Sequence, residues 1–248
     1  MKKSYIIIAI VVVLMIVAMG AYAIINNNSQ NKKQQENNTN VETTKDVNNT
    51  KESVQENNTE NQVANTQTNN ETNNESGENN MYSTGKHHAK IVVKNYGTIA
   101  LELDADVAPI TVENFANLVN EGFYNGLTFH RIISGFMIQG GDPLGNGTGG
   151  SSKTIKGEFA SNGVKNSISH VRGTISMARS SMPNSASSQF FIVHKDSTFL
   201  DGQYAAFGTV TSGMDVVDKI CADTAVEDDN GTVAKNNQPV IEKITMID

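Results

Sequence analysis

The chain divides into three parts of very different composition, and this division limits where a folded core can form. Residues 5–25 carry no charged side chain, residues 26–80 are almost wholly polar, and only residues 81–248 mix the two as globular proteins do. The middle part has no aromatic residue, so it cannot bury enough apolar surface to offset its conformational entropy. The remaining 168 residues suit one domain with a full hydrophobic core.

The apolar run at residues 5–25 predicts a membrane segment. As a helix, its 21 residues would span about 31 Å, close to the hydrocarbon thickness of a bilayer. Lys2-Lys3 precede the run and should stay in the cytoplasm, so we expect an uncleaved single-pass anchor in the cell membrane with the rest of the chain outside. Ala21-Tyr22-Ala23 matches a signal-peptidase site, so secretion after cleavage near Ala23 is the alternative.

The polar part at residues 26–80 contains 19 asparagines and 6 glutamines. This composition predicts a disordered linker, which as a flexible coil would have a root-mean-square span of roughly 40 Å. Such a linker would act as a spacer that holds a domain away from a membrane. The alternative is that the composition arose by drift and has no specific role, and the two interpretations are compatible. We therefore expect a membrane segment at residues 1–25, a linker at 26–80 and a folded domain at 81–248.

Charge and titratable residues argue against several classes of function. The net charge is −7 and no segment is strongly basic, which argues against nucleic-acid binding. Cys221 is the only cysteine, so an internal disulfide and a multi-cysteine zinc site are excluded. His87 and His88 are adjacent, and adjacent side chains on a strand or helix rarely face one metal ion. We expect no metal site.

Two further motifs are interpreted as loops. Residues 145–150 match the G-x-G-x-x-G fingerprint of dinucleotide-binding proteins, which requires a strand before it and a helix after it. Asp142-Pro143 precede the match and a serine pair follows, so the helix and strand context is missing. The acidic run at residues 227–231 lacks the spaced oxygens and final glutamate of a calcium loop, so we interpret it as a solvated turn.

Hydrophobic periodicity in the last part predicts short strands and two helices. One helix pattern begins at Pro109 and ends before Gly122, and the other covers residues 215–222. A turn is expected at residues 95–97 and a long loop at 140–157. The strands are expected at residues 90–94, 98–103, 127–133, 136–139, 174–178, 189–194, 205–210 and 240–247. Many short strands with only two helices favour a mainly β fold, a closed antiparallel barrel capped by helices.

Two stretches of this domain predict a pocket. Strand alternation places Arg131 on the face opposite His130. Residues 189–193 alternate in the same way, with Phe191 on one face and Phe190 on the core side. The other pocket candidates are Phe136, Met137, Gln139, Gln189 and Val193, and the other core candidates are Phe129 and Phe207. An apolar pocket with one cation and two amides, but no nucleophile or obvious general base, suits binding and electrostatic stabilisation rather than bond cleavage.

Three segments, in order and spacing, resemble the cyclophilin-type peptidyl-prolyl cis-trans isomerases: FHRIISGFMIQGGD from Phe129, SMARSSMPNSASSQFFI from Ser176 and FLDGQYAAFG from Phe199. The resemblance covers about residues 88–248, which is essentially the whole predicted domain. It implies a closed eight-stranded antiparallel barrel with two capping helices. It also implies isomerisation of Xaa-Pro bonds in peptides and proteins without a cofactor.

The resemblance implies a role for individual residues of this chain. Arg131 matches the family's catalytic arginine, and Gln139 and Gln189 match glutamines that hydrogen-bond the substrate backbone and orient this arginine. Tyr204 stands where many members have histidine. Phe199 stands where eukaryotic members have the tryptophan that contacts cyclosporin, so the resemblance does not carry strong cyclosporin binding over to this chain. The implied substrate-binding residues are Phe136, Met137, Ala178, Arg179, Gln189, Phe191, Phe199, Leu200 and Tyr204.

Two functions are compatible with this pattern. In the first, Arg131 donates a hydrogen bond to the twisted Xaa-Pro amide and lowers a rotation barrier of about 18–20 kcal/mol. The protein would then be a monomeric, membrane-tethered isomerase that acts outside the cytoplasm on proline-containing peptides and on unfolded or exported proteins. In the second, the pocket docks proline-containing segments without turnover. The arginine and the two glutamines favour the enzyme, because a site that only docks proline does not need the arginine.

Overall fold

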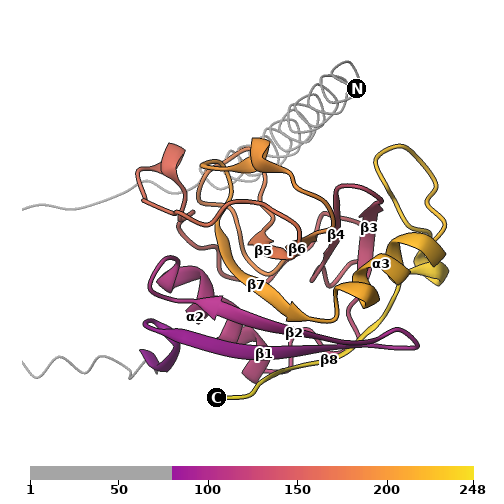
Figure 1. Ribbon diagram of the computed structural model, residues 1–248, viewed down its shortest axis with the longest axis horizontal. Coiled ribbons are helices and arrows are strands. Elements are labelled where there is room, and N and C mark those ends of the chain that lie inside the picture. Colours follow the sequence, from indigo (N-terminus) through magenta and orange to yellow (C-terminus); the bar gives the residue numbers. More distant parts are fainter. Residues whose placement is uncertain (1–79) are drawn as a thin grey trace, which may run out of the picture. The chain divides into compact units, whose positions relative to one another are not determined.

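Eight antiparallel strands form one sheet that curls around the core (Figure 1). The computed structural model describes residues 80–248; the predicted anchor at residues 1–25 and nearly all of the predicted linker at 26–80 lie outside the described residues. In sheet order the strands are β3 (Phe129–Ile133), β4 (Met137–Gly140), β6 (Phe190–Val193), β5 (Thr174–Met177), β7 (Ala206–Ser212), β2 (Gly97–Asp104), β1 (Lys86–Val93) and β8 (Ile241–Met246).

The sheet is a curled half-barrel whose two edge strands approach each other. Strands β3 and β8 are linked at their beginnings by an isolated antiparallel bridge between Thr128 and Val240. Beside this bridge, the amide of Phe129 donates to the carbonyl of Pro239 at 2.9 Å. The eight antiparallel strands are therefore confirmed, while the expected closure is observed as one bridge instead of a full ladder between the edge strands.

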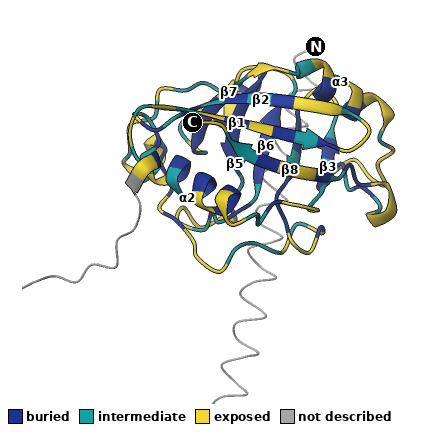
Figure 2. Ribbon diagram, turned by 90° about the horizontal axis from the view of Figure 1, so that it is seen from below, coloured by how far each residue is buried: buried dark blue, intermediate teal, exposed yellow. Residues whose placement is uncertain are grey.

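Alternation of apolar and polar residues explains the strands at the centre of this sheet. Along β2, Ile99, Leu101 and Leu103 are buried, and the residues between them are partly exposed (Figure 2). Strand β1 begins at Lys86, four residues before the predicted start, because its polar first residues pair with the end of β2. The predicted turn before β2 is confirmed, with Asn95 at a φ of 67°.

The two helices match the predicted patterns closely. Helix α2 (Pro109–Asn120) packs against β2 and β8, and helix α3 (Met214–Asp223) packs against β2. The amides at the start of α2 are capped by a distant carboxylate, since Glu158 accepts hydrogen bonds from the backbone N–H groups of Ile110 and Thr111 at 3.1 and 2.8 Å. Among residues 80–248, neither helix is both long and apolar enough to cross a membrane.

The buried side chains form two separate clusters. The larger cluster fills the space between sheet and helices, and it contains all three predicted core phenylalanines, Phe129, Phe190 and Phe207. The smaller cluster lies on the other face of β4 and β6 and consists of Phe136, Met137, Phe191, Val193 and Leu200. Strand alternation separates the two clusters, because neighbours such as Phe190 and Phe191 point to opposite faces of the sheet.

Candidate active site

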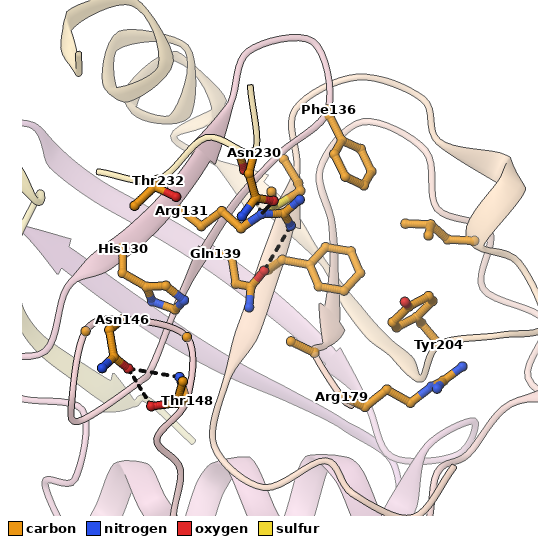
Figure 3. A pocket seen from close by; sticks show the side chains of 16 residues that line it. His130, Arg131, Phe136, Gln139, Asn146, Thr148, Arg179, Tyr204, Asn230 and Thr232 are labelled. Carbon is orange, nitrogen blue, oxygen red and sulfur yellow. Dashed lines mark hydrogen bonds between the residues drawn. The ribbon is translucent and has the colours of Figure 1, made fainter. Parts of the chain in front are cut away.

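The smaller apolar cluster lines a surface pocket of about 200 Å³ (Figure 3). Pairing of β4 with β6 sets Gln139 opposite Phe191 and Met137 opposite Val193, so residues from two separate segments meet there. The pocket is lined by His130, Arg131, Phe136, Met137, Gln139, Gly145, Asn146, Gly147, Thr148, Ala178, Arg179, Phe191, Leu200, Tyr204, Asn230 and Thr232.

Most of the residues expected from the sequence meet at this pocket. The residues that line it are Arg131, Phe136, Met137, Gln139, Ala178, Arg179, Phe191, Leu200 and Tyr204. Gln189 lies behind them, hydrogen-bonded to Gln139. Phe199 is 47% exposed beside the pocket, with its ring centroid 5.6 Å from that of Phe136.

Arg131 is held in the pocket by hydrogen bonds at two of its nitrogens. Its Nε donates to both the backbone oxygen and the side-chain Oδ1 of Asn230, at 2.8 and 3.0 Å. Its Nη1 donates to Oε1 of Gln139 at 3.3 Å (Figure 3). Burial lowers the pKa of Arg131 from its ordinary value, but an arginine this basic remains charged at neutral pH.

A chain of amides orients Gln139 toward the arginine. Nε2 of Gln139 donates to Oε1 of Gln189 at 2.9 Å. The Nε2 of Gln189 donates in turn to the carbonyls of Gly147 and Gly149 at 3.2 and 2.7 Å. These backbone acceptors determine which end of each amide is oxygen, so the Gln139 oxygen faces Arg131.

The prediction that His130 and Arg131 face opposite sides is wrong, since both line the pocket. The register between β3 and β4 shifts between Phe129 and Arg131, and such a bulge interrupts strand alternation. His130 is 4% exposed, and neither ring nitrogen has a hydrogen-bond partner among residues 80–248. Burial lowers its pKa to about 4, so the ring is neutral at physiological pH.

Two pocket segments were missed at the sequence level, although both were expected as loops. The acidic run at residues 227–231 is largely exposed, but it places Asn230 against Arg131. Residues 145–148 wrap around the buried Asp142, whose carboxylate accepts backbone N–H groups from Leu144, Asn146 and Gly147. Asn-Gly and Gly-rich spacing signals a turn, but no local signal shows that these turns reach β3 and β4.

The site combines an apolar pocket with fixed positive charge. Its sixteen lining residues include two arginines and no aspartate, glutamate, lysine, cysteine or serine. The hydroxyl groups of the lining therefore belong to Thr148, Thr232 and Tyr204, and serine, cysteine and lysine, which are common covalent nucleophiles, do not line the pocket. The geometry suits a ligand that places an apolar ring in the pocket and an uncharged polar group beside the guanidinium.

Comparisons with known proteins agree with this geometry. The family described as "Cyclophilin type peptidyl-prolyl cis-trans isomerase/CLD" matches residues 88–246, which include every pocket residue. A probable peptidyl-prolyl cis-trans isomerase of Brucella suis is 48% identical over 157 residues, covering 58% of this chain and 76% of that protein. Peptidyl-prolyl cis-trans isomerase B of Bacillus subtilis is 50% identical over 117 residues, covering 47% of this chain and 78% of that protein.

A solved structure shares the fold. The crystal structure of a cyclophilin type peptidyl-prolyl cis-trans isomerase of Cryptosporidium parvum, in the presence of the dipeptide Ala-Pro, matches with a TM-score of 0.58 and 31% identity. The match covers 65% of this chain and 99% of that chain. Since the family match spans well over half of the sequence and contains the whole pocket, this chain belongs to the cyclophilin-type peptidyl-prolyl cis-trans isomerases.

Proposed function

We propose that Arg131 accelerates Xaa-Pro isomerisation by donating a hydrogen bond to the twisted amide of a proline held in the pocket. Rotation removes amide resonance, which sets a barrier of about 18–20 kcal/mol. The proline nitrogen of the twisted amide then carries a localised lone pair, and a charged donor beside it stabilises this state more than the planar one. One such donor contributes about 3–4 kcal/mol, or roughly a hundred- to thousandfold in rate.

The observation that carries this proposal is the way the guanidinium is anchored. Nε is occupied by Asn230 and Nη1 by Gln139, whereas Nη2 has no hydrogen-bond partner among the described residues. The N–H groups of Nη2 are therefore available to a substrate, and the hydrogen bonds to Asn230 and Gln139 fix the direction in which they point. Phe136, Met137 and Phe191 provide the apolar walls that would hold the proline ring while the preceding residue rotates.

Substitution of Arg131 tests this mechanism. We expect Arg131→Ala to lower kcat/KM about a hundredfold or more while the far-ultraviolet circular dichroism stays unchanged. The measurement is NMR exchange between the cis and trans forms of a short Ala-Pro-Phe peptide. The matched variant Phe191→Ala should instead raise KM, because it removes a pocket wall. Peptide binding without Arg131-dependent exchange would contradict the mechanism.

We further propose that the enzyme is tethered to the cell membrane and acts outside the cytoplasm on exported proteins. The support is the uncharged run at residues 5–25 behind Lys2-Lys3, followed by the polar stretch at 26–80. Alkaline carbonate extraction should leave the protein in the membrane pellet. A soluble form that starts near Ile24 would show cleavage and contradict the anchor.

A further inference from the structure

The positive charge in the pocket is not neutralised by nearby acidic side chains. The chain has three arginines; Arg172 forms an ion pair with Asp218 at 2.8 Å, while Arg131 and Arg179 both line the pocket. Neither pocket arginine forms an ion pair with any residue between 80 and 248. This local excess of positive charge occurs in a chain whose net charge is −7.

Arg179 is fixed in place by aromatic rings and backbone carbonyls. Its guanidinium carbon lies 4.7 Å from the ring centroid of Tyr204 and 5.0 Å from that of Phe159. Its Nε and Nη2 donate to the carbonyl of Gln203 at 3.0 and 2.8 Å, and its Nη1 donates to the carbonyl of Ser180 at 2.8 Å. These neutral partners hold the head group without cancelling its charge, so little side-chain entropy remains to be lost when an anion binds.

The carboxylates near the pocket are already engaged elsewhere. Asp228 accepts hydrogen bonds from the amide and hydroxyl of Thr232 at 3.0 and 2.9 Å. Asp142 accepts three backbone amides and is 1% exposed. Asp201 is likewise hydrogen-bonded to Ser169 and His170. Arg179 therefore has no acidic partner among residues 80–248, which leaves its charge available to an acidic group of a ligand.

We propose that Arg179 makes the enzyme prefer peptides in which an acidic side chain flanks the proline. The proposal rests on the proposed function, since it takes the proline ring to lie in the apolar pocket with Arg131 at the rotating amide. Arg179 and Tyr204 lie together across the pocket from Asn230, which holds Arg131 (Figure 3). The two cations thus have separate tasks, one at the amide and one at a neighbouring side chain.

The expected preference is modest and depends on salt. Arg179 is half-buried at the rim, and an exposed ion pair changes affinity by about two- to fivefold at low ionic strength. Screening should weaken it strongly at about 0.5 M salt, where the Debye length is only several ångströms. A preference that comes from peptide shape would not depend on salt in this way.

Blocked peptides that differ only in one charge provide the test. Acetylated and amidated peptides with Ala-Pro at the centre carry Glu or its uncharged isostere Gln, either two residues before the proline or directly after it. The full-length protein is used, and kcat/KM is measured by NMR exchange. In at least one position we expect a Glu-to-Gln ratio of about two to five at low salt, falling to about one at high salt.

Variants identify the cation responsible. Arg179→Gln should bring the Glu-to-Gln ratio of kcat/KM to about one. A general loss of activity does not affect this ratio, because both peptides are measured with the same variant. Lys243→Gln removes the same charge from an exposed position on β8 outside the pocket and should leave both activity and ratio unchanged. If Arg179→Gln fails to fold, Arg179→Lys and the salt series on the wild type decide the question.

Two results would overturn the proposal: equal turnover of the Glu and Gln peptides at both positions, or a ratio that persists in Arg179→Gln or at high salt. Failure of the underlying mechanism is a different result. In that case Arg131→Ala would leave the turnover of all four peptides intact, whatever the Glu-to-Gln ratio.

Discussion

Arg131 depends on residues that are far from it in sequence. Asn230, ninety-nine positions further along the chain, accepts the Nε–H through two oxygens, whereas Gln139 approaches from the neighbouring strand. The backbone oxygen of Asn230 would remain in any substitution, but its side-chain oxygen would not. We therefore expect Asn230 to be a positioning residue whose side chain helps to set the direction of the guanidinium.

Asn230→Ala should lower kcat about fivefold and leave KM nearly unchanged. One of two acceptors of a charged donor is lost, which corresponds to about 1 kcal/mol. The loss should affect kcat because the guanidinium is misaimed while the apolar pocket is intact. The measurement is NMR exchange at several peptide concentrations, together with the resonance of the Arg131 Nε proton, which should shift. Asp229→Ala, at the exposed neighbouring position, is the control, and an unchanged kcat in Asn230→Ala would contradict the role.

His130 makes the stability of the protein depend on pH. Its pKa is lowered to about 4, chiefly by burial, with Arg131 and Lys235 also lowering it and Asp142 opposing them. The unfolded chain has an ordinary histidine pKa of about 6.5 and binds this proton first as the pH falls. Stability is therefore fully present above about pH 6.5 and is lost between there and about pH 4, by about 3 kcal/mol from this group.

NMR titration of the native protein checks this prediction for His130 alone. Its ring resonances should stay at the neutral position down to about pH 5, while urea unfolding shows a falling free energy over the same range. Unfolding also reports His170, whose pKa is likewise lowered by burial, so the ring resonance of His130 is the decisive measurement. A native titration near pH 6.5 would contradict the prediction.

At the scale of elements, the site depends on a turn at residues 228–232 that pairs with the edge strand β3. The amide of Ile132 donates to the carbonyl of Gly231 at 2.8 Å, and the amide of Val233 donates to the carbonyl of His130 at 3.0 Å. Arg131 and Thr232 form a bridge between these two segments. The bulge in β3 and the turn at residues 228–232 thus act together, and they place His130 and Arg131 on the same pocket.

Gly231→Ala should damage this arrangement more than a glycine substitution elsewhere. Gly231 has a φ of 80°, and a Cβ there would clash with the carbonyl of Ile132. Gly163 has a similar φ of 76° but open space around it, so Gly163→Ala should cost only about 1–2 kcal/mol of backbone strain. We expect Gly231→Ala to cost at least about 1 kcal/mol more in urea unfolding and to lower kcat. If both variants lost the same unfolding free energy and kept the same kcat, the turn could move to accommodate the added Cβ, and this prediction would be contradicted.

At the scale of the whole molecule, the sheet, both helices and the pocket lie in one unit at the C-terminal end of the chain. Tyr82 is 7% exposed and packs in the main core, so this unit includes the first described residues. Strand β1 lies between β2 and β8, with Ala89, Ile91 and Val93 buried. Every pocket residue belongs to this unit.

Residues 80–248 alone should therefore fold and keep the kcat/KM of the full-length protein within about twofold on a short peptide. A shorter form that starts at residue 95 lacks β1 and should not fold, because an interior strand and its buried side chains are removed. Urea unfolding followed by circular dichroism, with NMR exchange on the folded form, checks both expectations. A large loss of activity in residues 80–248 would show that the preceding segment contributes to catalysis.

The sequence by itself determined the elements whose signals are local. Helix α3 was expected at residues 215–222 and spans Met214–Asp223, because its apolar residues recur with the helical period. The turn at residues 95–97 was expected from Asn-Tyr-Gly, because asparagine and glycine tolerate the positive φ that turns require. Strand alternation already indicated Arg131, Phe136, Met137 and Phe191 as pocket candidates. The resemblance to cyclophilins added a catalytic role for Arg131 and the pocket residues Ala178, Arg179, Leu200 and Tyr204, which lie within continuous motifs.

Only the tertiary structure decided the surroundings of Arg131. A bulge in β3 places His130 in the pocket, and Asn230 provides acceptors for the guanidinium of Arg131. The guanidinium of Arg179 lies over the ring of Tyr204. Arg131 and Asn230 are ninety-nine positions apart, and the hydrophobic pattern around either residue does not predict that they are in contact. The physical reason is that hydrophobic periodicity depends only on which face of a segment is buried. The hydrogen-bond partners of a buried charge or of an edge strand are instead supplied by segments that are distant in sequence and meet only in the folded protein.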